Sequence, residues 1–199
     1  MKYLIVVSLL IAQVACVGTN KPRPDMALYD FGYAIKSDSK PLLTKTEIEP
    51  VTANEMLNYQ KMRYRLEYVN PARVFYFTES RWIVPPAELV NNQLNALVNT
   101  QTQSNSKPFN CSLKLKLQVF DQVFNSKDSS AGVVQINAIL LAKNTKQLVM
   151  NEVINESALS KNPNAEGGAK ALAKASENAL VKAVNWANAQ ATQNTICNN

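Results

Sequence analysis

The sequence predicts a single α+β domain in which one antiparallel β-sheet carries two helices on one of its faces. Several segments alternate apolar and polar residues with a period of two, as half-buried strands do. One other segment repeats its apolar residues with the 3.6-residue period of a helix, and the last segment is rich in alanine, as helices are. The order is strands, helix, three strands, helix. The 199 residues suffice for one domain with a core and are too few for two domains of ordinary size.

The first group of strands is expected between residues 26 and 78. Residues 26–35 are rich in aromatic and aliphatic side chains and predict the first strand. A second strand at 47–53 contains Pro50, which places it at a sheet edge or a bulge. Asn70-Pro71 predicts a turn, followed by a partner strand at 72–78. The strand before this turn is half-buried, because four apolar positions alternate with charged ones: Met62, Tyr64, Leu66 and Tyr68.

The period changes to that of a helix after Pro85-Pro86. Three strands follow, at 113–119, 134–140 and 148–157. We expect a closing helix over about 165–191, with Asn162 as its N-cap, Pro163 at its first position and a weak point at Gly167-Gly168. The first helix is predicted by apolar residues that share one face: Val90, Leu94, Leu97 and Val98.

The N-terminus has the pattern of an export signal. Residues 3–12 form one apolar run behind Lys2, too short for the about 20 residues of a membrane span. We interpret residues 1–15 as a signal peptide, and Cys16 directly behind it resembles a bacterial lipobox. Such a cysteine is lipidated on its sulfur before the chain is cut in front of it. Gln13 stands where an aliphatic residue is usual, so ordinary secretory cleavage is the alternative.

An acyl anchor on Cys16 would hold the protein firmly on a membrane, because each buried CH₂ contributes about 0.8 kcal/mol. Val17 follows instead of the aspartate associated with inner-membrane retention, which predicts sorting to the outer membrane, facing the periplasm. Residues 16–25 then form the lipidated cysteine and a flexible, proline-containing tether, and residues 26–199 form the domain.

Three cysteines are present, and lipidation of Cys16 leaves an even pair. An exported protein matures in an oxidising compartment, so we expect Cys111 and Cys197 to form a disulfide. Two unpaired buried thiols are the alternative.

The residue types argue against catalysis. Histidine is absent, which removes the commonest acid–base group at neutral pH and the commonest metal ligand. No phosphate-binding loop, paired-cysteine motif or nucleophile elbow occurs, so we expect no enzyme, no cofactor and no bound metal. The net charge of +6 includes no basic block, and an exported protein is not expected to bind nucleic acid. Lys114 and Lys116 are interpreted as part of the solvent-exposed face of a strand, with contact to lipid head groups as the alternative.

The middle of the chain carries a recognisable series of short motifs. Tyr64-Arg65 closes one strand, and Arg81-Trp82 is followed by Pro85 and a leucine-containing helix. This order resembles the ABC-type transport auxiliary lipoprotein family of PqiC-like outer-membrane lipoproteins, over most of residues 16–190. The Val-Pro-Pro at the helix entry departs from the single proline usual there.

The resemblance implies a non-catalytic, periplasm-facing lipoprotein that works with a mammalian-cell-entry (MCE) type protein and an ABC permease and ATPase. Such systems move lipids or other apolar molecules between the two membranes. Trp82 is expected to pack against the sheet and Arg81 to brace the helix entry, with direct partner contact as the alternative. A structural or assembly lipoprotein of the outer membrane without a transporter partner is the second hypothesis for function, and self-association into a homo-oligomer is left open.

Overall fold

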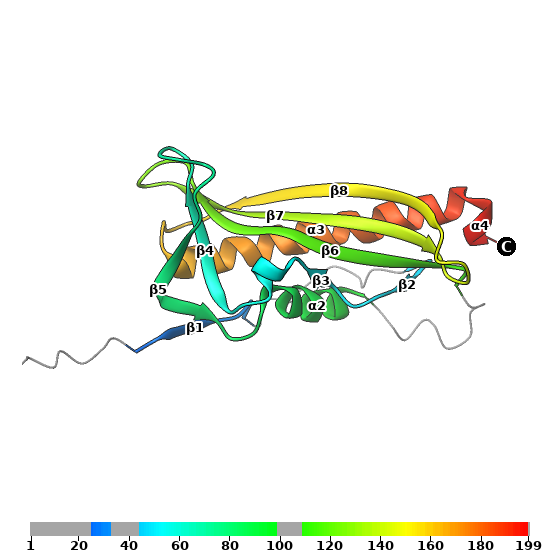
Figure 1. Ribbon diagram of the computed structural model, residues 1–199, viewed down its shortest axis with the longest axis horizontal. Helices are drawn as coiled ribbons and strands as arrows, with labels where there is room; N and C mark the ends of the chain where they lie inside the picture. Colours follow the sequence, from blue (N-terminus) through cyan, green and yellow to red (C-terminus); the bar gives the residue numbers. More distant parts are fainter. Residues whose placement is uncertain (1–24, 33–43, 99–108, 199) are drawn as a thin grey trace, which may run out of the picture.

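The computed structural model describes residues 25–32, 44–98 and 109–198, which form one elongated body (Figure 1). The expected signal peptide, Cys16 and most of the expected tether lie outside these residues. Within the described residues the elements are β1 (Ala27–Tyr29), β2 (Glu47–Ile48), β3 (Thr52–Ala53), η1 (Glu55–Leu57), β4 (Lys61–Leu66), β5 (Phe75–Trp82), α2 (Pro86–Leu97), β6 (Cys111–Phe124), β7 (Ser130–Ala142), β8 (Leu148–Leu159), α3 (Ala165–Gln193) and α4 (Thr195–Asn198).

The α+β class is confirmed, but the prediction of a purely antiparallel sheet is wrong. The eight-stranded sheet has the order β1-β5-β4-β6-β7-β8, and β2 and β3 also pair with β6. β1 runs parallel to β5, and β2, β3 and β4 all run parallel to β6. β1 occupies the outer edge of β5, and β4 occupies its other edge. After α2, the next strand, β6, therefore pairs with the free edge of β4. There β6 is antiparallel to β7 and parallel to β4.

Several expected boundaries also differ. Residues 47–53 form two short strands on either side of Pro50, rather than one. The strand after the Asn70-Pro71 turn begins at Phe75 and not at residue 72. The N-cap of α3 is Asn164 and not Asn162, because the Asn164 side chain accepts a hydrogen bond from the backbone N–H of Gly167 at 2.8 Å. The predicted element order holds in outline only, since η1 and α4 are additional.

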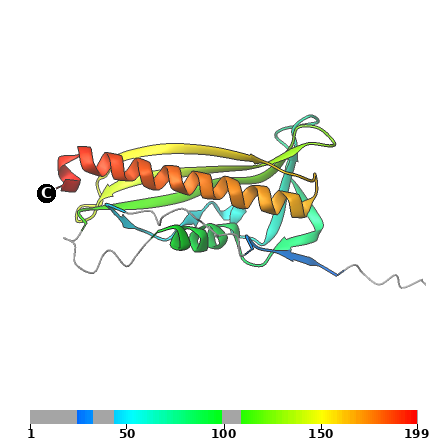
Figure 2. The same ribbon diagram turned by 180° about the vertical axis from the view of Figure 1, so that it is seen from behind.

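Both long helices cover the same face of the sheet, and the core lies between them and the strands (Figure 2). The even-numbered residues of β7 and the odd-numbered residues in the first half of β6 point into this core, as strand alternation requires. They pack against α2 and α3 as one continuous hydrophobic cluster. The opposite face of β6–β8 carries no helix (Figure 1). Among the described residues, no helix combines the length and apolar character of a membrane span.

Glycines mark where α3 approaches the sheet most closely. A Cβ atom at Gly132 of β7 would lie 2.5 Å from the backbone nitrogen of Leu172, and one at Gly168 would lie 2.0 Å from Oε1 of Gln122. The first contact would displace the helix backbone, and the second would displace the end of the Gln122 side chain. Gly168, in the pair that the sequence marks as a weak point of the helix, therefore lets the first turn sit directly on the sheet, whereas Gly167 faces the connection at Ser160 and Asn162.

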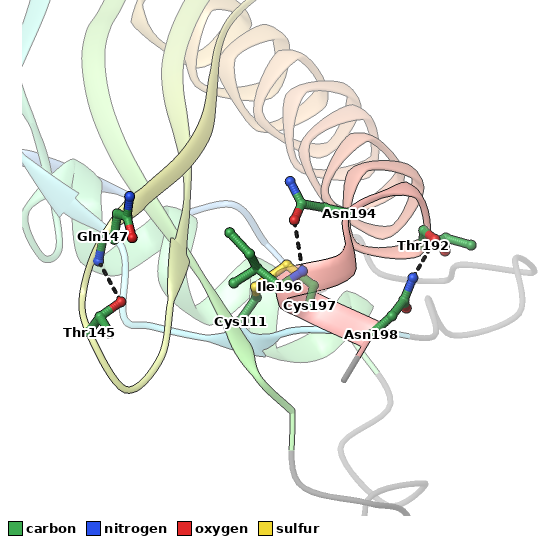
Figure 3. Close-up of a disulfide and its surroundings, with 8 residues drawn as sticks. All are labelled: Cys111, Thr145, Gln147, Thr192, Asn194, Ile196, Cys197 and Asn198. Carbon is green, nitrogen blue, oxygen red and sulfur yellow. Dashed lines mark hydrogen bonds between the residues drawn. A yellow bond between two sulfur atoms is a disulfide. The ribbon is translucent and has the colours of Figure 1, made fainter.

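A disulfide closes the domain at the end opposite to β1 (Figures 1 and 3). It joins Cys111, the first residue of β6, to Cys197 in α4, with 5.2 Å between the two Cα atoms, so the expected pairing is present. The two cysteines are 86 residues apart. A loop of that size gives about 4–5 kcal/mol of stabilisation on the chain-entropy estimate. The bond fixes α4, and thereby the end of α3, to the beginning of β6.

The contact between α3 and β7 predicts the effect of adding one methyl group. Gly132→Ala must displace the helix backbone at Leu172, so we expect the free energy of unfolding to fall by about 2–3 kcal/mol. Chemical denaturation measures this change. Ser157→Ala, on the exposed face of β8, is the matched strand control and should change stability by less than about 0.5 kcal/mol. Equal stability of Gly132→Ala and the wild type would contradict the close approach of the helix.

Candidate functional site around the β4–β5 hairpin

The residues of the family-like motif lie on both faces of the β4–β5 hairpin. β4 pairs antiparallel with β5 and parallel with β6, and its register places Tyr64 opposite Gln122 and Arg65 opposite Val123. Successive side chains of a strand point to opposite faces. Tyr64 therefore points toward the core, while Arg63 and Arg65 point to the face without helices.

On this face two guanidinium groups hold one buried carboxylate. Asp121 of β6 is completely buried; its Oδ1 lies 2.8 Å from Nε of Arg63 and its Oδ2 lies 2.6 Å from Nε of Arg65. Arg65 also donates from Nη1 to the carbonyl oxygen of Pro71, at 2.9 Å. We call Arg63, Arg65 and Asp121 the charge triad. It ties β4 to β6 and to the connection before β5, and it carries one net positive charge.

The core side of the hairpin is aromatic. The ring of Tyr64 lies 5.2 Å from that of Phe75, 4.7 Å from Phe77 and 5.7 Å from Phe124, measured between centroids. Such arrangements contribute about 0.5–1.5 kcal/mol per pair beyond the buried area. The Tyr64-Arg65 pair thus serves two faces at once: the tyrosine packs into the core and the arginine binds the buried carboxylate.

Trp82, the last residue of β5, belongs to a second aromatic cluster. Its side chain is 1% exposed and meets the ring of Phe120 at 5.5 Å and that of Phe31 at 6.1 Å. This is the packing position that the sequence suggested for it. Pro85 caps α2 through its carbonyl oxygen, which accepts from the N–H of Glu88 at 3.0 Å, and Pro86 occupies the first turn. The second proline of the Val-Pro-Pro sequence therefore opens the helix.

Arg81 is different, because it is the exposed member of the motif. It lies on β5 beside Leu28 of β1 and Lys61 of β4, on the face without helices. Within the described part of the chain its guanidinium forms no hydrogen bond or ion pair, so the expected bracing of the helix entry does not take that form.

A cavity of about 380 Å³ lies between α2, α3 and the residues after β1. Phe31, Leu89 and Ala173 supply apolar walls, and Gln93 donates to the carbonyl oxygen of Ala173 at 3.0 Å. Its two lysines are paired: Lys174 binds Glu177 at 3.0 Å, and Lys170 binds Glu166 at 2.5 Å. That hydrogen bond and the charge of Lys170 lower the pKa of the Glu166 carboxyl. In the described residues no three potential metal ligands gather.

The sequence reasoning missed Asp121 and Arg63. The signal was present, because Asp121 stands within the otherwise apolar end of a long strand, Val-Phe-Asp-Gln-Val-Phe. A carboxylate in such a position is almost never buried without a partner. Arg63 and Arg65, spaced by two residues, lie on one face of their strand, as a bidentate partner would require.

Removing the charge of Asp121 tests the triad. Asp121→Asn leaves two partly buried guanidinium groups without their carboxylate, so we expect a loss of about 3–5 kcal/mol in unfolding free energy. Asp128→Asn, in the exposed turn after β6, is the matched control and should be near neutral. The triple variant Arg63→Met, Arg65→Met, Asp121→Leu should recover most of the loss, because apolar groups can replace a buried ion cluster. A stable Asp121→Asn variant in denaturation would refute the role of the triad.

The fold is similar to solved structures, although no family model and no curated protein matches the sequence. A Xanthomonas campestris protein, XCC0632, of the family DUF330, aligns over 85% of this chain and 94% of its own, with a TM-score of 0.63 and 12% identity. An uncharacterized protein aligns over 82% of this chain and 97% of its own, with a TM-score of 0.55 and 14% identity. Lipoprotein GNA1162 of Neisseria meningitidis reaches a TM-score of 0.29 at 14% identity, covering 73% of this chain and 99% of its own, which is too low to indicate a common fold. The chain therefore has the fold of XCC0632.

Proposed function

We propose that the protein is a non-catalytic, periplasm-facing lipoprotein subunit of an ABC/MCE-type envelope transport system. In this proposal it is anchored in the outer membrane through Cys16 and serves the movement of lipids or other apolar molecules between the two membranes. The domain contributes binding surfaces rather than chemistry.

The disulfide between Cys111 and Cys197 is the observation that supports export of the protein. Disulfides persist in oxidising compartments, and the bacterial periplasm is one of them. The third cysteine, Cys16, follows the signal-like apolar run and is left over for lipid. The pattern of the N-terminus and the state of the other two cysteines thus support the same compartment.

The transport role rests on the motif resemblance and is compatible with the fold. The order of motifs from Tyr64-Arg65 to Pro85 is that of the transport auxiliary lipoproteins, and the fold agrees with a DUF330 protein over most of both chains. Fold likeness alone does not fix function. The carboxylate of Asp121 is engaged by two arginines, which fits a role without catalysis.

A structural or assembly lipoprotein without a transporter partner is the second candidate. One observation favours it: Tyr64, Arg65 and Trp82 are used for packing and for the charge triad. The contacts of those three motif residues inside the domain therefore explain their presence without a partner.

Lipidation of Cys16 predicts membrane attachment of the whole chain. Cys16→Ser removes the sulfur that would carry the diacylglycerol, so the protein should disappear from the outer-membrane fraction. Fractionation of cells and immunoblotting measure the distribution. The Cys111→Ser, Cys197→Ser double variant controls for the loss of cysteines as such, and it should stay with the membrane. A Cys16→Ser protein that still sediments with the outer membrane contradicts the anchor.

An affinity pull-down of the full-length protein from detergent-solubilised envelopes tests the partner. We expect an MCE-type protein among the bound proteins, with or without its ABC permease and ATPase, identified by mass spectrometry. An unrelated outer-membrane lipoprotein with the same tag is the control. Recovery of only outer-membrane or cell-wall components would replace the transport role with the structural one.

A further inference from the structure

An exposed patch of mixed apolar, tyrosine and cationic residues surrounds β1. Leu28 is 62% exposed, Tyr59 64%, Tyr76 46% and Ile83 50%, and Lys61 and Arg81 are exposed as well. We call these six residues the edge patch. Individually exposed apolar residues are ordinary, whereas a contiguous group with tyrosines and cations is characteristic of a surface that meets another phase or partner.

The strand register and one cation–π contact link four of the six residues, and Tyr59 stands two residues before Lys61 in the sequence. Leu28 is the register partner of Arg81 across β1 and β5, and Arg81 is the register partner of Lys61 across β5 and β4. The Lys61 ammonium lies 5.2 Å from the centroid of the Tyr76 ring. Ile83 is fixed beside this row, because its N–H donates to the carbonyl oxygen of Tyr29 and its own carbonyl oxygen accepts from the Gln60 side chain at 2.7 Å.

The six residues of the patch include two cations and no carboxylate. Within the described residues neither Lys61 nor Arg81 forms a salt bridge. Arg63 is the register partner of Tyr76 and belongs to the charge triad, which adds one net positive charge beside the patch. Glu79 of β5 borders a separate hollow together with Asn164 and Ala165 at the beginning of α3. The surface is thus complementary to anions.

The position of the patch on the chain indicates which anionic surface it meets. The described chain begins at Asp25, directly before β1, and Cys16 lies nine residues earlier in the sequence. Nine residues can span at most about 30 Å, so a lipid on Cys16 keeps β1 within that distance of the membrane. Figure 1 shows β1 at one end of the elongated body and α4, which carries Cys197 of the disulfide, at the other, so the patch is at the anchored end.

We infer that the edge patch lies against an anionic phospholipid surface, with Lys61 and Arg81 at the phosphates and Leu28, Tyr59, Tyr76 and Ile83 at the interface. Tyrosines favour the head-group level because their rings are apolar and their hydroxyls are polar. Basic residues near an anionic bilayer add attraction that fades within a Debye length. This inference rests on the proposed anchor at Cys16 and adds an orientation to it: the β1 edge is flat on the membrane, and the disulfide end points away.

The experiment uses the chain from residue 17 onward, which has no lipid. All residues of the hydrophobic core lie at or after β1, so the truncated chain keeps the whole core. Co-sedimentation is measured with vesicles of equimolar phosphatidylcholine and phosphatidylglycerol, and with phosphatidylcholine alone. We expect binding to the anionic vesicles that weakens with salt. Lys61→Gln with Arg81→Gln should lower the partition coefficient about 25-fold, on the basis of about fivefold per cation.

Matched variants keep the result interpretable. Lys127→Gln with Lys161→Gln removes the same charge from exposed positions outside the patch and should change binding less than about twofold. Leu28→Ser with Tyr59→Ser should weaken binding to anionic vesicles while leaving its salt dependence unchanged. Thermal unfolding confirms that each variant is folded. No binding to anionic vesicles, or an equal loss in the Lys127 and Lys161 control, overturns the inference.

The two proposals fail in different ways. The distribution of Cys16→Ser in cells tests the lipid anchor. The vesicle assay tests the edge patch alone, because the chain used there carries no lipid. If Lys61→Gln with Arg81→Gln leaves vesicle binding unchanged and instead abolishes recovery of a protein in the pull-down, the patch is a protein-docking surface and the lipid inference is wrong.

Discussion

The pairing of one buried carboxylate with two arginines is the constraint on which the sheet depends. Asp121 projects from β6, and Arg63 and Arg65 project from β4 on the same face. A register slip of one residue would turn both guanidinium groups into the core and Tyr64 out of it. The triad therefore fixes the parallel pairing of β4 with β6, which a hydrophobic pattern alone leaves undetermined. It also positions the turn before β5 through the bond from Arg65 to Pro71.

From this junction the molecule extends in two directions. The hairpin and β1 form the short end, where the edge patch lies. The β6–β8 strands and α3 form the long end, which is closed by the Cys111–Cys197 disulfide (Figures 1 and 3). The close contacts of Gly132 with Leu172 and of Gly168 with Gln122 lie beside the junction, because Gln122 is the register partner of both Tyr64 and Gly132. β6 belongs to both ends, and the triad joins it to the hairpin.

The sequence predicts what depends on local periodicity and misses what depends on distant partners. The alternation in β4, β6 and β7 predicts those strands, the 3.6-residue period predicts α2, and the alanine-rich composition predicts α3. No short sequence pattern distinguishes parallel from antiparallel pairing of these strands, so the mixed sheet topology could not be derived from the sequence. Asn162 and Asn164 are both plausible caps by residue type, and only the hydrogen bond to Gly167 distinguishes them. The triad needed the knowledge that β4 and β6 are neighbours.

The motif residues separate structural from functional information. Tyr64, Arg65 and Trp82 are satisfied inside the domain, by aromatic contacts or by Asp121, and they can recur in any chain with this fold whatever it binds. Arg81 has no such partner among the described residues and is exposed on a row with Leu28 and Lys61. An exposed cation that the fold does not require is retained for an external contact or is free to vary. Arg81 is therefore the residue of this motif at which proteins of the same fold and different function should differ.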